Sequence, residues 1–399
     1  MPLKRNAFRI MLIGTIFLAA NINAETIDSI TTSPKNFEQQ IRSAVTPMAG
    51  KEIIGLKVLR LSGDIGPWLD TGMMLKPGDK ITMILEGKKW LSRALNLSFN
   101  APLATWAKIG ADGLIFRGSR KTNTFTSSTD GSLRLKLYPS VRWLDVSGNY
   151  LGEPTKINPD AGGGVDVAII HWNNTTNVQQ ALNDLAERNP AIQWAKAELD
   201  RQKNQKSPPK GWQNIWEFNP SEIFTEVTVN NEKNAPNNII ELNMHDDVSI
   251  IEKEASFDLT PQTTLSWKWK IKELPSLVAE NSLPSHDYMS IAVKFDNGRD
   301  LTFFWSSELA IDKAFHCPLP GWAHRETHVV ARTGKNDLNK WLSEEKNIFE
   351  YYKKTIGGVL PKKITHIWLI GVSVFQHTDG LSQFGDIILK DDKTSIQVY

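Results

Sequence analysis

Apolar and polar residues alternate over many short stretches of the chain, a pattern that predicts β-strands. Between residues 80 and 86, apolar Ile81, Met83 and Leu85 alternate with polar Lys80, Thr82 and Glu86, and Ile84 breaks the alternation. A period of two places such residues on one face of a strand. The preceding residues 76–79, Lys-Pro-Gly-Asp, suit a tight turn, because proline presets φ and glycine accepts a positive φ. Similar runs between turn residues lead us to predict a β-sandwich over residues 53–173.

The hydrophobic period changes to that of a helix in two places. Ser33-Pro34 has the composition of a helix start, and Phe37, Ile41 and Ala44 follow at helical spacing. Residues 178–203 carry a second helical pattern that is interrupted near Pro190, and a charged, proline-rich stretch follows it. We therefore predict a helical connector over residues 174–210, with a domain boundary near residue 208.

Alternation returns after residue 211. In residues 263–271, Leu265, Trp267, Trp269 and Ile271 alternate with polar residues. Residues 338–358 are the exception, because their apolar residues suit a helix that ends at Gly-Gly. The prediction is a mainly β protein, with two β-sandwich (jelly-roll-like) domains joined by a helical connector; the second domain spans residues 211–399.

The first 24 residues have the features of a cleavable signal peptide. Lys4, Arg5 and Arg9 form a basic start, and residues 10–20 form an apolar core too short for a permanent membrane span. Ala24 is a small residue at the expected cleavage point. We expect a periplasmic or secreted protein with residues 25–52 as an N-terminal extension. No later stretch predicts a transmembrane segment in the mature protein.

The charge balance gives no reason to expect nucleic-acid binding. The chain has 46 Lys and Arg against 44 Asp and Glu. Removal of the three basic residues of the signal segment leaves 43 basic against 44 acidic side chains. The mature chain is close to neutral and has no basic patch, so it lacks the electrostatic footprint of nucleic-acid-binding proteins.

Cys317 is the only cysteine of the chain. An exported protein with one cysteine has no internal disulfide, so burial of apolar surface must stabilise it. We expect Cys317 to be a small buried apolar residue rather than a nucleophile.

The first domain resembles the calcium-dependent galactose-binding lectin domain of Gram-negative bacteria, over about residues 56–172. The resemblance is carried by Trp68 with residues 78–82 and Gly87, by Gly110-Ala111-Asp112-Gly113-Leu114-Ile115, and by Gly163-Gly164-Val165-Asp166-Val167-Ala168-Ile169. It implies a sandwich fold and a sugar site built around calcium.

Several site positions of that lectin family are altered here. The family's Asn-Asp ligand pair falls on Tyr138-Pro139, and its Asn-Asn pair falls on Asp160-Ala161. The position of a sugar-contacting Gln falls on Asp112, and that of a His falls on Ile109. Calcium takes six to eight oxygen ligands. We predict no cofactor, and calcium held by Asp160 and Asn158 remains the alternative.

The second half, from about residue 212 to 392, resembles a family of exported bacterial domains of unknown function. The resemblance is carried by Leu265-Ser266-Trp267-Lys268-Trp269, His286-Asp287-Tyr288, residues 346–352 and Phe384-Gly385-Asp386-Ile387. It implies no known chemistry. His286 and Tyr351 stand where the family often has Asp, so an acidic site of the family would be incomplete here.

Two groups of residues are candidates for chemistry in the second half. On a strand, His324, Glu326 and His328 would share one face, and two histidines with a carboxylate can bind zinc or another transition metal. Asp287, Asp386 and Glu326 are candidate carboxylates for glycoside hydrolysis, which in most enzymes uses a pair of acids. No nucleophile elbow, P-loop or H-E-x-x-H motif is present.

The fourteen tryptophans of the chain provide candidate sugar-stacking faces. Trp106, Trp143 and Trp322 lie in stretches that we predict to be loops, so with Asp112 they are the predicted ligand-binding residues. We predict a non-catalytic protein that recognises an envelope or extracellular polysaccharide. The alternatives are a polysaccharide hydrolase or lyase, and an envelope structural or assembly factor that binds unidentified protein partners.

Overall fold

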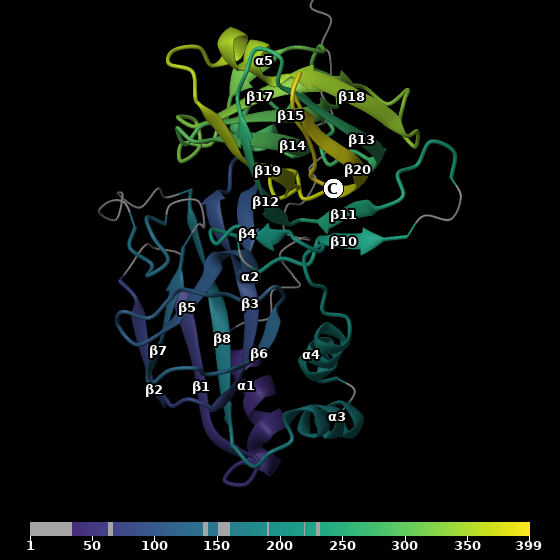
Figure 1. Cartoon of the computed structure of the whole chain (residues 1–399). Coiled ribbons are helices and arrows are strands. Elements are labelled where there is room, and N and C mark those ends of the chain that lie inside the picture. Colours follow the sequence, from purple (N-terminus) through teal and green to yellow (C-terminus); the bar gives the residue numbers. More distant parts are fainter. Residues whose placement is uncertain are drawn as a thin grey trace, which may run out of the picture.

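The computed structural model describes residues 34–62, 67–138, 143–150, 160–189, 191–218, 220–228 and 232–399. The fold is mainly β, with several sheets stacked as sandwiches, as the alternation predicts (Figure 1). The expected signal peptide, Pro139 and Asn158 lie outside the described residues. No helix in the described part of the chain combines the length and apolar character needed to cross a membrane.

The first half of the chain forms a sandwich of two sheets. Its strands are β1 (Ile53–Ser62), β2 (Leu69–Leu75), β3 (Lys80–Ser92), β4 (Leu97–Asn100), β5 (Thr105–Ile109), β6 (Thr122–Thr126), β7 (Gly131–Leu137) and β8 (Gly162–Trp172). One sheet has the order β1-β8-β3-β4, with β6 paired to β3, and the other has the order β2-β7-β5. Ile81, Met83 and Leu85 point into the core between the sheets, as predicted.

Three helices cover the outer face of the five-stranded sheet. They are α1 (Pro34–Val45), α3 (Val178–Arg188) and α4 (Gln193–Lys203), and the short α2 (Ala101–Ala104) follows β4. Phe37 and Ile41 of α1 and Leu182 of α3 pack in one buried cluster with Ile84 and Trp172 of the sheet. The predicted helical segments are therefore present, and the helices after β8 are packed layers of the first half rather than a free spacer.

The second half forms a larger sandwich. Its elements are β9 (Gln213–Asn214), β10 (Phe224–Val227), β11 (Ile239–His245), β12 (Val248–Asp258), β13 (Thr264–Glu273), η5 (Leu283–Ser285), β14 (Tyr288–Phe295), β15 (Asp300–Ser306), β16 (Ala314–His316), β17 (Glu326–Thr333), β18 (Leu342–Asn347), α5 (Ile348–Thr355), β19 (Lys363–Val372), β20 (Asp379–Lys390) and β21 (Ser395–Gln397). One sheet has the order β10-β11-β20-β13-β18, with β21 paired to β20. The other is seven-stranded, β16-β17-β15-β14-β19-β12-β9.

Trp267 and Trp269 of β13 pack in the core between these sheets, as their alternation predicts. The helix expected over residues 338–358 is shorter than predicted. Residues 342–347 form strand β18 against β13, and α5 begins only after Asn347, whose side chain accepts a hydrogen bond from the Glu350 amide. Pairing with the edge of β13 outweighs the helical spacing there.

One strand pair of the second half is parallel, which creates a crossover segment. β15 and β17 are parallel neighbours, so residues 307–325 must cross back over one face of the seven-stranded sheet. Strand β16 lies within this segment and pairs with β17. We call the sheet face away from the Trp267 core the outer face; the crossover segment packs on it.

The outer face also carries the junction between the two halves of the chain (Figure 1). Leu97 and Leu103 of the first half belong to the same buried cluster as Trp322, Trp368 and Phe375 of the second half. The side-chain amide of Asn100 donates a hydrogen bond to the Asp246 carboxylate across the junction. The two sandwiches are thus held together by apolar burial and hydrogen bonds.

Candidate functional site

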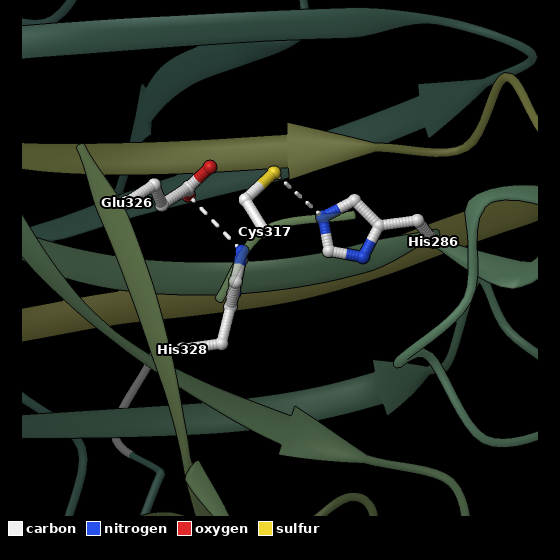
Figure 2. A group of neighbouring side chains, drawn as sticks. All are labelled: His286, Cys317, Glu326 and His328. Atoms are coloured by element: carbon white, nitrogen blue, oxygen red, sulfur yellow. Dashed lines mark hydrogen bonds and ion pairs between the residues drawn. The ribbon is translucent and has the colours of Figure 1, made fainter. Parts of the chain in front are cut away.

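Four buried side chains with metal-binding atoms converge on the outer face of the seven-stranded sheet: His286, Cys317, Glu326 and His328 (Figure 2). His286 follows η5 and precedes β14, and Cys317 follows β16. Glu326 and His328 lie two residues apart on β17 and therefore point to the same face. A backbone hydrogen bond of 3.1 Å from the Cys317 amide to the Glu326 carbonyl fixes the crossover segment against β17.

The ligand atoms of these four residues all lie within 4.8 Å of one another. His286 Nε2 is 3.4 Å from Cys317 Sγ, and His328 Nε2 is 3.4 Å from a Glu326 carboxylate oxygen. His286 Nδ1 lies 2.7 Å from the carbonyl oxygen of Glu280. A carbonyl only accepts, so Nδ1 of a neutral His286 ring carries the proton and its Nε2 lone pair faces Cys317.

Aromatic rings and hydroxyl groups surround the cluster. The Phe315 ring stacks on His328 with centroids 5.1 Å apart, and the Tyr288 ring lies edge-on to His328 at 4.8 Å. The Tyr288 hydroxyl donates to Glu326 Oε1 at 3.1 Å, and the Thr302 hydroxyl lies 3.3 Å from the same oxygen. The carboxylate of Glu326 is therefore oriented by two hydroxyl groups at the edge of the cluster.

The protonation of the cluster follows from its burial and internal contacts. Burial, reinforced by His328, lowers the pKa of His286 to about 3. Burial alone would raise the pKa of Glu326, but the adjacent His328 outweighs it and the pKa falls to about 2. Burial raises the pKa of the Cys317 thiol. The Asp300 carboxylate accepts a hydrogen bond of 3.2 Å from the Thr302 hydroxyl. Burial, together with the charge of Glu326, holds the pKa of Asp300 well above the usual range.

The structure brings together two of the three sequence-predicted metal ligands. Glu326 and His328 lie in the cluster, whereas His324 is exposed in the turn before β17. Cys317 is buried, as expected, but among polar groups that the sequence did not connect with it. His286 and Cys317 were missed as partners because neither shares a motif with β17. The crossover brings Cys317 to β17, and the pairing of β14 with β15 brings His286 there.

A second, charged group lies near the cluster on the same face, and solvent reaches it. The Arg325 guanidinium lies 3.6 Å from the centre of the Trp322 ring, and the Lys294 ammonium lies 4.9 Å from that of Trp368. The two tryptophan rings are 6.3 Å apart. Arg325 and Lys294 are half-buried, and so are the acidic residues of this group, Glu217 and Glu252. We call these six residues the charged tryptophan group.

Carboxylates complete the charged tryptophan group. Glu252 accepts a hydrogen bond of 3.1 Å from the Trp368 indole nitrogen. Burial raises the pKa of Glu217, and the charges of Arg325 and Lys294 partly oppose that rise. Opposite charges thus gather over two indole rings at the edge of an otherwise buried face.

The burial of the predicted stacking tryptophans contradicts their expected role as open loop platforms. Trp106 lies on β5 and is 1% exposed, and Trp143 is 7% exposed and packs against Trp106. Trp322 is 3% exposed beneath Arg325. Trp106 and Trp143 are buried because residues 143–150 fold back on the outer side of β5. There the Ile115 amide donates a hydrogen bond to the Val146 carbonyl.

Of the two predicted calcium ligands, Asp160 lies in the described part of the chain and Asn158 lies outside it. Asp160 accepts hydrogen bonds from the Arg93 amide at 3.1 Å, the Ala94 amide at 2.9 Å and the Ser92 hydroxyl. These contacts fix the turn between β3 and β4, and they occupy both carboxylate oxygens. Asp112 is exposed in the turn after β5.

The candidate catalytic acids lie in different environments. Asp287 is fully buried and accepts hydrogen bonds from the amides of Phe375 at 3.0 Å and Gln376 at 2.6 Å. Asp386 lies on β20 of the opposite sheet, 2.9 Å from the Lys268 ammonium. Glu326 belongs to the His/Cys cluster. The structure therefore does not place Asp386 beside the other two acids.

Residues 210–388 match the model of a family described as "Protein of unknown function (DUF3047)". No curated protein matches the chain. These residues cover most of the second sandwich, which is the part that carries both the His/Cys cluster and the charged tryptophan group.

Solved structures similar to the chain include lectin-like and carbohydrate-binding sandwich domains. The EclA N-terminal domain, a PllA-like lectin, has 15% identity and a TM-score of 0.21, covering 29% of this chain and 94% of its own. A family 30 carbohydrate-binding module of a Clostridium thermocellum cellulase has 11% identity and a TM-score of 0.25, covering 47% and 91%. The xyloglucanase domain of NopAA from Sinorhizobium fredii has 10% identity and a TM-score of 0.27, covering 45% and 93%. At these TM-scores the likeness carries no argument about function.

Proposed function

We propose that the protein is exported and binds a polysaccharide of the cell envelope or the extracellular space without turnover. The observation that carries this proposal is the charged tryptophan group, where two cations cover two indole rings beside two carboxylates. Ligand sites combine an apolar floor with a few convergent polar groups. This group has that composition, and its half-buried cations and acids are accessible to solvent.

The charged side chains, rather than open indole faces, would make the polar contacts to the glycan. Guanidinium, ammonium and carboxylate groups donate to or accept from sugar hydroxyls, and such charge-assisted hydrogen bonds are the stronger ones. Trp322 and Trp368 would form a rigid floor beneath Arg325 and Lys294. Because Lys and Arg stems are flexible, a sugar ring that displaces either cation would also gain an indole face.

The test is retention of the protein on immobilised polysaccharides, with release of reducing ends measured on the same samples. We expect Arg325→Ala and Lys294→Ala each to weaken retention by about 1.5–3 kcal/mol, the range for hydrogen bonds to charged groups. Lys353→Ala on α5 is the matched control, because Lys353 is an exposed lysine whose ammonium lies 5.3 Å from the Phe349 ring centre.

Two outcomes would contradict the proposal. One is wild-type protein that no envelope or extracellular polysaccharide retains. The other is reducing-end release that Asp287→Asn abolishes while retention persists, because a general acid or base contributes to the transition state rather than to ground-state binding. The second outcome would favour a hydrolase.

A further inference from the structure

We propose that His286, Cys317, Glu326 and His328 bind one zinc ion, at a structural centre that is separate from the proposed glycan site. The proposal stands on the convergence of four different ligand atoms from three chain segments (Figure 2). It does not depend on glycan binding.

The spacing of the four ligand atoms fits tetrahedral zinc. Bonds of about 2.0–2.3 Å from zinc to nitrogen, oxygen and sulfur place the ligand atoms about 3.3–3.8 Å apart. The Cys317–His286 and Glu326–His328 separations are both 3.4 Å, and no separation exceeds 4.8 Å. Small side-chain rotations therefore bring all four atoms to bonding distance without movement of the strands.

The ligand chemistry also balances the charge of the ion. A thiolate and a carboxylate carry two negative charges, which a zinc ion neutralises, and two neutral imidazoles complete the coordination. Charges taken out of water are expensive unless they are paired or bind a metal. A set of one thiolate, one carboxylate and two imidazoles is a zinc-type donor set rather than a calcium or magnesium one.

The surroundings of His286 match those of a metal-bound imidazole, and those of His328 leave its Nε2 beside the other ligand atoms. A ligating histidine usually donates its other ring nitrogen to a carbonyl or carboxylate, which fixes its tautomer. His286 meets this condition through the Glu280 carbonyl, leaving Nε2 free to coordinate. His328 is fully buried, and within the described part of the chain its Nδ1 has no hydrogen-bond partner and its Nε2 has only the long contact of 3.4 Å to the Glu326 carboxylate. A buried ring nitrogen without a short hydrogen bond is costly, and a metal bond at Nε2 would supply a strong partner.

The burial of the site indicates a structural rather than a catalytic centre. Structural zinc sites are closed with four protein ligands, whereas catalytic sites keep one position for water or substrate. All four residues here are at most 2% exposed. The ion would join the crossover segment to β17 and to the residue before β14. Without it, the crossover is held to the sheet mainly by the backbone hydrogen bonds between the three-residue strand β16 and β17.

The experiment measures zinc in purified full-length protein after dialysis against metal-free buffer, and it then replaces zinc with cobalt. We expect one zinc per chain. Cobalt should give a thiolate-to-metal absorption band, and because the chain has a single cysteine, such a band identifies Cys317 as the ligand. Chelator should remove the band and lower the melting temperature.

Variants locate the site. Cys317→Ser should abolish the cobalt band and His328→Ala should reduce bound zinc at least tenfold, whereas His324→Ala, an exposed neighbour, should retain both. If the first two variants fail to fold, the wild-type cobalt spectrum still decides the matter. Less than a tenth of an equivalent of zinc with no cobalt band, one equivalent of copper in place of zinc, or zinc lost equally in His324→Ala would each overturn the proposal.

Discussion

The His377 ring bridges the two sandwiches between two acceptors. Its Nδ1 lies 2.7 Å from an Asp246 carboxylate oxygen in the second sandwich, and its Nε2 lies 3.0 Å from the Asn96 carbonyl in the first. Because a carboxylate and a carbonyl both accept, the geometry favours a ring that carries two protons. The hydrogen bond to Asp246 accordingly raises the pKa of His377, and Lys88 nearby opposes that rise.

Replacement of His377 by alanine should weaken the junction in a pH-dependent way. A raised folded-state pKa gives stability that is fully present below the unfolded pKa of about 6.5 and is lost as pH rises through the folded pKa. We expect His377→Ala to cost about 1.5–3 kcal/mol at pH 5.5, the range for hydrogen bonds to charged groups, and clearly less at pH 9. Urea unfolding at both pH values measures this.

The matched control for that variant is His245→Ala. His245 lies 2.6 Å from Asp379, but its side chain is 73% exposed and the pair lies within one sandwich. Exposed ion pairs contribute little, so this variant should change stability by well under 1 kcal/mol. Equal losses for the two variants, or a His377→Ala loss that is independent of pH, would contradict the bridging role.

Asp287, like His377, should contribute stability that falls as pH rises, but in a lower pH window. Burial raises the pKa of Asp287 to about 7, against the pull of its two backbone hydrogen bonds. The folded state then holds a proton that the unfolded state releases, so this group makes stability fall by up to about 1.4 kcal/mol per unit between pH 4 and pH 7. Asp287→Asn should therefore be less destabilising, relative to wild type, at pH 8 than at pH 5.

Chemical unfolding at those two pH values tests the Asp287 prediction. Asp386→Asn is the control, because Asp386 is partly exposed and paired with Lys268, and its effect should not follow this window. A deficit of Asp287→Asn that is the same at pH 5 and pH 8 would show that Asp287 stays ionised in the folded protein.

Trp143 should act through stability alone. It stacks on Trp68 with centroids 5.6 Å apart, and it also contacts Tyr138 at 4.4 Å. Trp143→Ala should cost about 3–5 kcal/mol, as for other buried aromatic truncations, and leave the folded protein's polysaccharide retention unchanged. Trp90→Ala on β3, where the ring is half-buried, should cost less. Loss of retention in folded Trp143→Ala would restore a ligand role for this cluster.

Calcium should leave the melting temperature of the protein unchanged. A ligand stabilises the folded state by RT ln(1 + [L]/Kd), so a tight site would raise the melting temperature at millimolar calcium. Because Asp160 fixes the turn after β3, Asp160→Ala should lower the melting temperature by the same amount with or without calcium. A calcium-dependent rise that Asp160→Ala abolishes would instead identify a calcium site.

The sequence predicted the layers well because period-two alternation is a local property. Ile81, Met83 and Leu85 face the first core, and Trp267 and Trp269 face the second, as the pattern indicates. Period alone misplaced residues 342–347, because a short amphipathic stretch suits a helix or an edge strand, and its partner β13 lies more than seventy residues away. Edge pairing is not visible in a local pattern.

The candidate site was only half predictable for a related reason. Glu326 and His328 are near neighbours on one strand, so their spacing already places them on one face. Cys317 joins them through the parallel crossover between β15 and β17, and His286 joins them because it precedes β14, which pairs with β15. No spacing rule reports that topology. Glycine and proline content also suggested open loops around Trp106 and Trp143, whereas long-range packing buries both rings.

Because the two sandwiches share one apolar cluster at their junction, neither can be exchanged or unfolded without exposing part of that cluster. Leu97 and Leu103 fill space against Trp322 and Phe375, and the Arg117 guanidinium, fully enclosed, donates to the Phe218 carbonyl. A fragment of residues 211–399 would present that surface to water and leave the Phe218 carbonyl without its partner. Recombination that exchanged either sandwich for an unrelated one would meet the same mismatch. The two sandwiches should therefore unfold in a single cooperative transition and evolve as one unit, unlike domains joined only by a linker.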